Sequence, residues 1–130
     1  MNTTIMPAEV MITVESACAI AVESWRLRCV AGGLSDTNEG LIIRRSHRQL
    51  TEALNGMNIA VVDFAGRMYD PGMAPEVVEV QEDPELQEGR VIVGETITPT
   101  VTWHGQVVKA GQITIRRSTS KLNKLTEVAE

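Results

Sequence analysis

The side chains in this sequence that could carry acid–base chemistry are a group of carboxylates and one histidine, His47. Acid–base catalysis needs titratable groups that lie close together and have suitably shifted pKa values. The carboxylates have no neighbouring His or Lys, and their spacing is typical of a solvated loop. They are Glu76, Glu79, Glu82, Asp83, Glu85 and Glu88. A small hydrolase that uses Glu76, Glu79 or Glu82 is one alternative, but the sequence favours a binding protein that is not an enzyme.

The possible metal ligands are also few. His47 shares an expected helix face with the apolar residues Ile43, Leu50 and Leu54, and no second His or Cys stands at ligand spacing. His47 is therefore interpreted as a packed or interhelical polar residue. Cys18 and Cys29 form no Cys-x-x-Cys pair and are interpreted as small core residues. The sequence contains no P-loop, no Gly-x-Gly-x-x-Gly and no His-Glu-x-x-His motif. We therefore expect no metal and no cofactor.

Composition and charge narrow the class of partner. The chain has 130 residues, of which 43% are hydrophobic and only 3% aromatic, so its core is expected to consist of aliphatic side chains. The net charge is -5, which argues against nucleic-acid binding. Arginines gather in the first half of the chain and carboxylates in the second. These charges form either two solvated faces or a surface that attracts a protein partner of complementary charge. Without a signal-peptide pattern or an apolar run of membrane-spanning length, we expect a cytoplasmic protein that does not contact a membrane.

The first half of the chain predicts two helices. Apolar residues at steps of three and four indicate a helix over residues 8–31, and its apolar surface is too broad for one neighbouring helix to cover. Gly32-Gly33 is expected to end it in a left-handed conformation. A second helix is expected over about residues 36–55. It begins at capping residues before Glu39 and ends at Asn55-Gly56. Together they predict a helical hairpin over residues 8–56.

The second half predicts a small all-β domain over residues 57–117. Strands are expected over 59–64, 77–80 and 96–103, followed by a hairpin turn at His104-Gly105 and return strands around Val107 and Ile113. Residues 81–90 are expected to form an acidic loop, and Gly111 a bulge or kink. Residues 1–7 and 118–130 are interpreted as a short leading segment and a polar tail. The predicted fold class is α+β.

Four short motifs occur in a fixed order between residues 36 and 117. Gly40-Leu41 begins the second expected helix and Gly56 ends it. Tyr69-Asp70-Pro71 follows the first strand, and the run Gly105-Gln106-Val107-Val108-Lys109-Ala110 precedes Ile113-Thr114-Ile115. In their order and spacing these motifs resemble the GrpE family, the nucleotide exchange factors of DnaK-type chaperones. That family has Phe-Asp-Pro or Leu-Asp-Pro at the turn.

The resemblance implies a cochaperone that binds the nucleotide-binding domain of a DnaK-type chaperone and promotes ADP release. It implies a homodimer in which paired helical hairpins form a four-helix bundle, with one β-domain on each side. The residues expected to face the chaperone are Gly40, Ile97, Gln106 and Ile115. The residues expected to drive dimerisation by apolar burial are Met11, Val14, Cys18, Ala21, Trp25, Ile43, Leu50 and Leu54.

The sequence also departs from the family pattern. About seven residues precede the first expected helix, so we expect a short, divergent member without the family's long N-terminal helix. Gln106 stands where the family usually has arginine, which removes a charge-assisted contact of about 1.5 to 3 kcal/mol. The alternative function is therefore a scaffold or adaptor that keeps a GrpE-like fold but binds a different protein.

Overall fold

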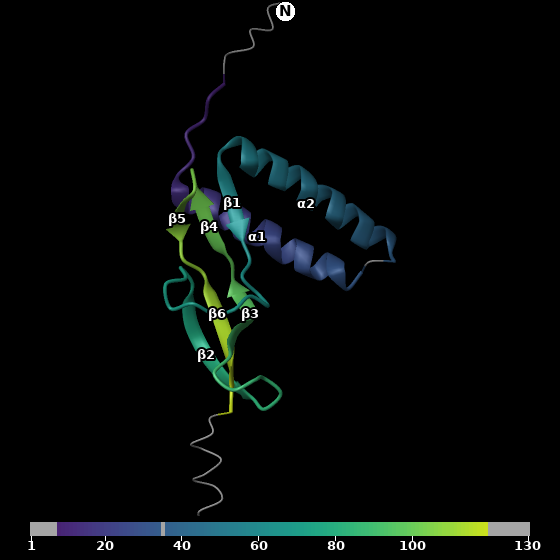
Figure 1. Cartoon of the computed structure of the whole chain (residues 1–130). Coiled ribbons are helices and arrows are strands. Elements are labelled where there is room, and N and C mark those ends of the chain that lie inside the picture. Colours follow the sequence, from purple (N-terminus) through teal and green to yellow (C-terminus); the bar gives the residue numbers. More distant parts are fainter. Residues whose placement is uncertain (1–7, 35, 120–130) are drawn as a thin grey trace, which may run out of the picture.

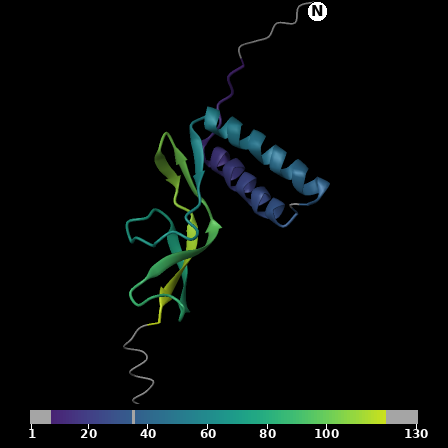
Figure 2. The same cartoon turned by 45° about the vertical axis from the view of Figure 1, so that its right-hand side comes forward.

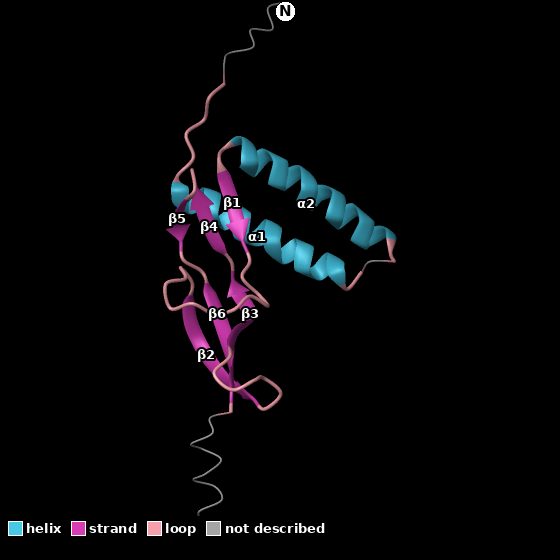
Figure 3. Ribbon diagram, viewed as in Figure 1, coloured by secondary structure: helices cyan, strands magenta, loops and turns pink. Residues whose placement is uncertain are grey.

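The computed structural model describes residues 8–34 and 36–119, and it confirms the predicted α+β class. Two helices precede six short strands (Figures 1 and 3). The elements are α1 (Val14–Gly32), α2 (Asn38–Gly56), β1 (Ile59–Val62), β2 (Glu76–Asp83), β3 (Val91–Thr98), β4 (Thr100–Trp103), β5 (Gln106–Lys109) and β6 (Gln112–Ser118). The leading segment 1–7 and residues 120–130 of the expected tail lie outside the described residues.

The first helix begins later than the sequence pattern predicts. Thr13 caps α1 in an extended conformation, and its hydroxyl accepts a hydrogen bond from the Ser16 backbone N–H at 3.0 Å. This cap stops the helix at Val14, so the expected start at Ala8 is wrong and Met11 lies in the extended chain before the helix. The other end also differs, because Gly33 has φ of -82° and is not left-handed.

The strands form two separate three-stranded sheets. One has the order β1-β4-β5 with antiparallel neighbours. The other has the order β2-β6-β3, in which β2 runs parallel to β6 and β3 antiparallel to it. The helical hairpin lies against the β1-β4-β5 sheet, and the second sheet extends away from the helices (Figures 1 and 2).

Two details of the strands correct the sequence prediction. The expected single strand over 96–103 is divided at Pro99, which lacks a backbone N–H, and its two parts enter different sheets. Residues 81–83 belong to β2 and not to the expected acidic loop. The predicted turn at His104-Gly105 is confirmed, with φ of 51° and 77°, as is the kink at Gly111, with φ of 80°.

Each sheet has its own apolar core. The first core joins the helical hairpin to the β1-β4-β5 sheet and contains Ala17, Cys18, Ala21, Val22, Leu54, Ile59 and Val101. The second lies in the other sheet and is built on Val93, Ile113 and Ile115. Much of the broad apolar surface of α1 is therefore covered by the chain's own sheet, where the sequence led us to expect further helices. Cys29, expected in the core, is exposed, whereas Cys18 is buried as expected.

Candidate functional site

The four residues expected to face a chaperone differ in accessibility. Ile97 on β3 retains 43% of its surface, and Gln106 at the start of β5 is also exposed. Ile115 on β6 is only 9% exposed and packs in the core of its sheet, so its side chain is not presented to a partner. Gly40 is buried as well. Two of the four expected contact residues are therefore accessible.

Gly40 has a structural role where the two helices meet. A Cβ atom added at this position would lie 1.8 Å from the carbonyl oxygen of Leu34, which is far inside contact distance. The Gly40 N–H also donates to the Thr37 hydroxyl at 3.0 Å, and this bond caps α2. The chain thus requires glycine here for the close approach of its own backbone.

The residues expected to drive dimerisation also divide into groups. Cys18, Ala21 and Leu54 are buried in the core between the helical hairpin and the first sheet, so they are not available to a second chain. Trp25, Ile43 and Leu50 are partly buried, while Val14 and Met11 are exposed. Met11 lies outside α1, and three of the helical positions pack against the chain's own sheet, where the sequence pattern predicted a second chain.

Other apolar side chains remain exposed on α1. Ile20, Leu27 and Val30 retain 41%, 42% and 56% of their surface. Their spacing of seven and three residues places them on one side of the helix. We call these three residues the α1 stripe. On α2, Leu41 and Ile42 are exposed and line a pocket together with Arg44, Arg45 and Arg48.

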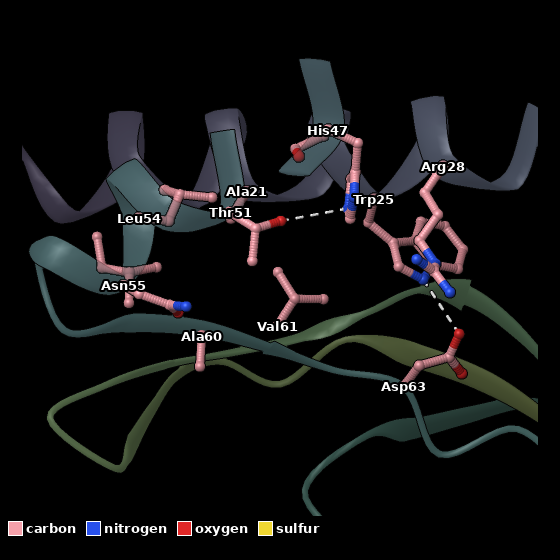
Figure 4. Close-up of a pocket in the computed structure, with 12 residues that line it drawn as sticks. Ala21, Trp25, Arg28, His47, Thr51, Leu54, Asn55, Ala60, Val61 and Asp63 are labelled. Carbon is pink, nitrogen blue, oxygen red and sulfur yellow. Dashed lines mark hydrogen bonds between the residues drawn. The ribbon is translucent and has the colours of Figure 1, made fainter. Parts of the chain in front are cut away.

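A pocket of about 470 Å³ lies between the helical hairpin and β1 (Figure 4). We call it the hairpin–sheet pocket. Four of its lining residues are buried and four are exposed, so it has an inner end and an open rim. The buried ones are Ala21, Ser24, Leu54 and Ile59, and the exposed ones are Arg28, Asn55, Ala60 and Asp63. Trp25, His47, Thr51 and Val61, which are partly buried, complete the lining.

Asp63 connects the helix to both sheets at the pocket rim. One carboxylate oxygen accepts a hydrogen bond from the Trp25 indole N–H at 3.0 Å (Figure 4). The other accepts from the Thr96 hydroxyl at 2.6 Å and from the Ala65 backbone N–H at 2.9 Å. Burial by itself would raise the pKa of Asp63, but these hydrogen bonds and the charge of Arg67 outweigh it and lower the pKa. Asp63 is therefore ionised at neutral pH, with three donors already in place.

His47 stands on the opposite wall of the pocket. Burial first, and then the positive charge of Arg28, lower the pKa of His47, so its ring is neutral at physiological pH. Its Nε2 atom lies 3.4 Å from the Thr51 hydroxyl (Figure 4). The same imidazole borders a smaller recess with Arg44, Arg48 and Glu52. This agrees with the expectation that His47 is a polar residue packed between helices.

The carboxylates that first suggested acid–base chemistry are used differently. Asp83 pairs with Arg116 at 3.2 Å and Glu82 with Arg117 at 3.4 Å, so two of them link β2 to β6. Within residues 8–34 and 36–119, no group of three or more His, Cys, Asp or Glu side chains could hold a metal ion. Nor does any helix in that part of the chain have the length and apolarity to cross a membrane.

The pocket was not found by sequence reasoning. Trp25 and Asp63 are 38 residues apart, and no motif spacing connects them. One signal was available, because Asp63 is a lone carboxylate inside the apolar run of residues 59–64. A charge at such a position indicates a specific partner. Scans against protein-family models and curated proteins found no match to this sequence.

Proposed function

We propose that this protein is a GrpE-like cochaperone that binds the nucleotide-binding domain of a DnaK-type chaperone and promotes ADP release. The observation that carries the proposal is the order of the four sequence motifs, combined with the positions they occupy in the α+β fold. Each motif stands at a junction between elements or on a strand.

The motifs have definite structural roles. Gly40-Leu41 occupies the first turn of α2 and Gly56 is its last residue. In the link between β1 and β2, the Asp70 carboxylate accepts a hydrogen bond from the Gly72 N–H at 2.9 Å, which makes an Asx turn through Pro71. The motif that begins at Gly105 forms the β4–β5 turn and all of β5, and Ile113 follows in β6.

The proposed mechanism requires no chemistry from this chain. An exchange factor opens the nucleotide cleft only by binding the open chaperone more tightly than the closed, ADP-bound form. Reciprocity then requires that ADP weaken the binding of the exchange factor by the same factor. The exposed Ile97 and Gln106 would supply contacts that form with the open state. Gly40 and Ile115 would act indirectly, by keeping the helical hairpin and the second sheet in shape.

Dimerisation belongs to the same proposal. Because Cys18, Ala21 and Leu54 are already buried in the chain, the α1 stripe is the better candidate for the helix-to-helix contact. Light scattering at micromolar concentration should report a dimer for the wild type. Leu27→Asp should shift it toward monomer, because a buried carboxylate without a partner is costly, whereas Val78→Asp on the exposed part of β2 should not. A wild-type monomer would remove the dimer from the proposal.

The test of exchange is the release of a fluorescent ADP analogue from DnaK-type chaperones of the same cell, measured by stopped flow. Acceleration by the wild type should be lost in the double variant Ile97→Asp, Gln106→Ala and kept in Val78→Asp, whose side chain is 47% exposed on β2. Gln106→Arg should strengthen chaperone binding by roughly tenfold or more if the family's charge-assisted contact is restored.

The second candidate is a scaffold or adaptor that binds another protein. The observation in its favour is that only two of the four expected chaperone contacts are accessible, and that one of these is Gln106 in place of arginine. Absence of acceleration with every chaperone tested, by a protein shown to be folded, would reject the exchange proposal. An unchanged affinity of Gln106→Arg for the chaperone would show that the surface has been reassigned.

A further inference from the structure

The hairpin–sheet pocket contains a buried polar group without a partner. Ser24 is 3% exposed, and its hydroxyl oxygen has no hydrogen-bond partner among the described residues. Buried polar groups are almost always hydrogen-bonded, because an unsatisfied one keeps its full desolvation cost. Ser24 also lines the pocket. The oxygen itself has less than 1 Å² of accessible surface, so a group that enters the pocket would reach it only after the Ser24 side chain rotates toward the pocket.

A positive charge lies one helical turn away. Arg28 follows Ser24 by four residues, so both side chains leave the same side of α1. Within residues 8–34 and 36–119, the guanidinium of Arg28 makes no hydrogen bond or ion pair. The guanidinium and the hydroxyl are both hydrogen-bond donors, and a carboxylate can accept from both.

The rest of the lining limits the charge and shape of a ligand. Asp63 is ionised at the rim and has its donors in place, so a doubly charged anion such as a phosphate monoester would be repelled. Leu54, Ala60 and Val61 offer an apolar surface beside the Trp25 indole. The volume of about 470 Å³ suits a molecule of one or two rings.

We propose that the hairpin–sheet pocket binds a small organic molecule with a single carboxylate on a flat apolar body. The carboxylate accepts hydrogen bonds from the Arg28 guanidinium and the Ser24 hydroxyl. The apolar body lies on Ala60 and Val61 of β1, beneath the helical hairpin. This inference does not depend on the exchange proposal, since neither Ile97 nor Gln106 lines the pocket.

The test uses the full chain and the probe 2-naphthoate, with the neutral 2-naphthamide as its matched control. Titration is followed by the indole N–H signal of Trp25 in two-dimensional NMR. Trp103 is the other tryptophan of the chain and lines a different pocket, so its signal is the internal reference. The carboxylate should shift the Trp25 signal at millimolar concentration and bind at least roughly tenfold more tightly than the amide, as expected for one charge-assisted hydrogen bond.

Three variants locate the binding groups. Arg28→Gln should weaken 2-naphthoate binding by roughly 10- to 100-fold and Ser24→Ala by several-fold. Arg26→Gln, two residues away and paired with Glu23, should leave it unchanged. Equal binding of the acid and the amide, or no shift of Trp25 with either, would overturn the proposal even if a variant failed to fold. If the Arg28 and Arg26 variants lost the same affinity for 2-naphthoate, the binding would depend on general surface charge and the proposed site would be wrong.

Discussion

Replacing Gly40 by alanine tests whether this glycine serves the fold or a binding partner. The added Cβ would lie 1.8 Å from the Leu34 carbonyl oxygen and 2.6 Å from the Leu34 carbonyl carbon. Neither atom is at the end of a flexible side chain, so the turn between the helices must move. That oxygen accepts hydrogen bonds from the Thr37 N–H at 3.1 Å and from the Thr37 hydroxyl at 2.8 Å. Moving it therefore disturbs the residue that caps α2.

The size of the effect follows from these contacts. Loss of the N-cap costs about 1 kcal/mol. The two hydrogen bonds that the Leu34 carbonyl oxygen accepts from Thr37 contribute about 1 kcal/mol each. Alanine recovers about 1 kcal/mol over glycine inside a helix. We therefore expect Gly40→Ala to lower the free energy of unfolding by about 2 kcal/mol.

Urea denaturation followed by circular dichroism measures this change. Gly56→Ala is the matched control, because Gly56 is the last residue of α2 and a Cβ there meets no atom within 4 Å. That variant should match the wild type or exceed it by up to about 1 kcal/mol. If Gly40→Ala proved as stable as Gly56→Ala, the steric argument would be wrong. A stable Gly40→Ala protein that no longer bound the chaperone would return this glycine to the binding surface.

Three further predictions concern the core and the surface. Because the pKa of Asp63 is lowered on folding, its contribution to stability is present above its unfolded pKa of about 3.9 and is lost as the pH falls through the lower folded value. Asp63→Asn should accordingly have a lower free energy of unfolding than the wild type at neutral pH, and this difference should be smaller at about pH 3. A difference in free energy of unfolding that is the same at both pH values would refute this reasoning. Gly111→Ala should lower the melting temperature more than Gly89→Ala. Both glycines have a left-handed φ, of 80° and 82°, but only at Gly111 would a Cβ meet backbone, 2.6 Å from the Thr98 carbonyl oxygen. Equal melting temperatures of the two variants would contradict this prediction. In the native protein a thiol reagent should modify the exposed Cys29 faster than the buried Cys18, although burial and the charge of Asp63 raise the pKa of Cys29 and so slow its reaction. Mass spectrometry of the labelled peptides measures both rates, and labelling of Cys18 as fast as Cys29 would show that the first core opens readily.

The helical hairpin and the turns could be predicted from the sequence because local interactions specify them. The spacing of apolar residues in steps of three and four identifies α1 and α2. Glycine at positions 105 and 111 marks two places where φ is positive. Such signals depend on neighbours within a few residues, so they survive without knowledge of the rest of the chain. The α+β class and the order of its elements followed from them.

Only the tertiary structure decided what covers each apolar face. Periodicity places Cys18 on the apolar side of α1 and Leu54 on the apolar side of α2. It does not show whether a sheet or a second chain covers these sides. The same limit hid the hairpin–sheet pocket, whose Trp25 and Asp63 meet across 38 residues. Burial and long-range hydrogen bonds depend on how the elements pack, and that arrangement is a property of the whole chain. For this reason the sequence determined the elements of the protein, and the packing of those elements determined its accessible surfaces.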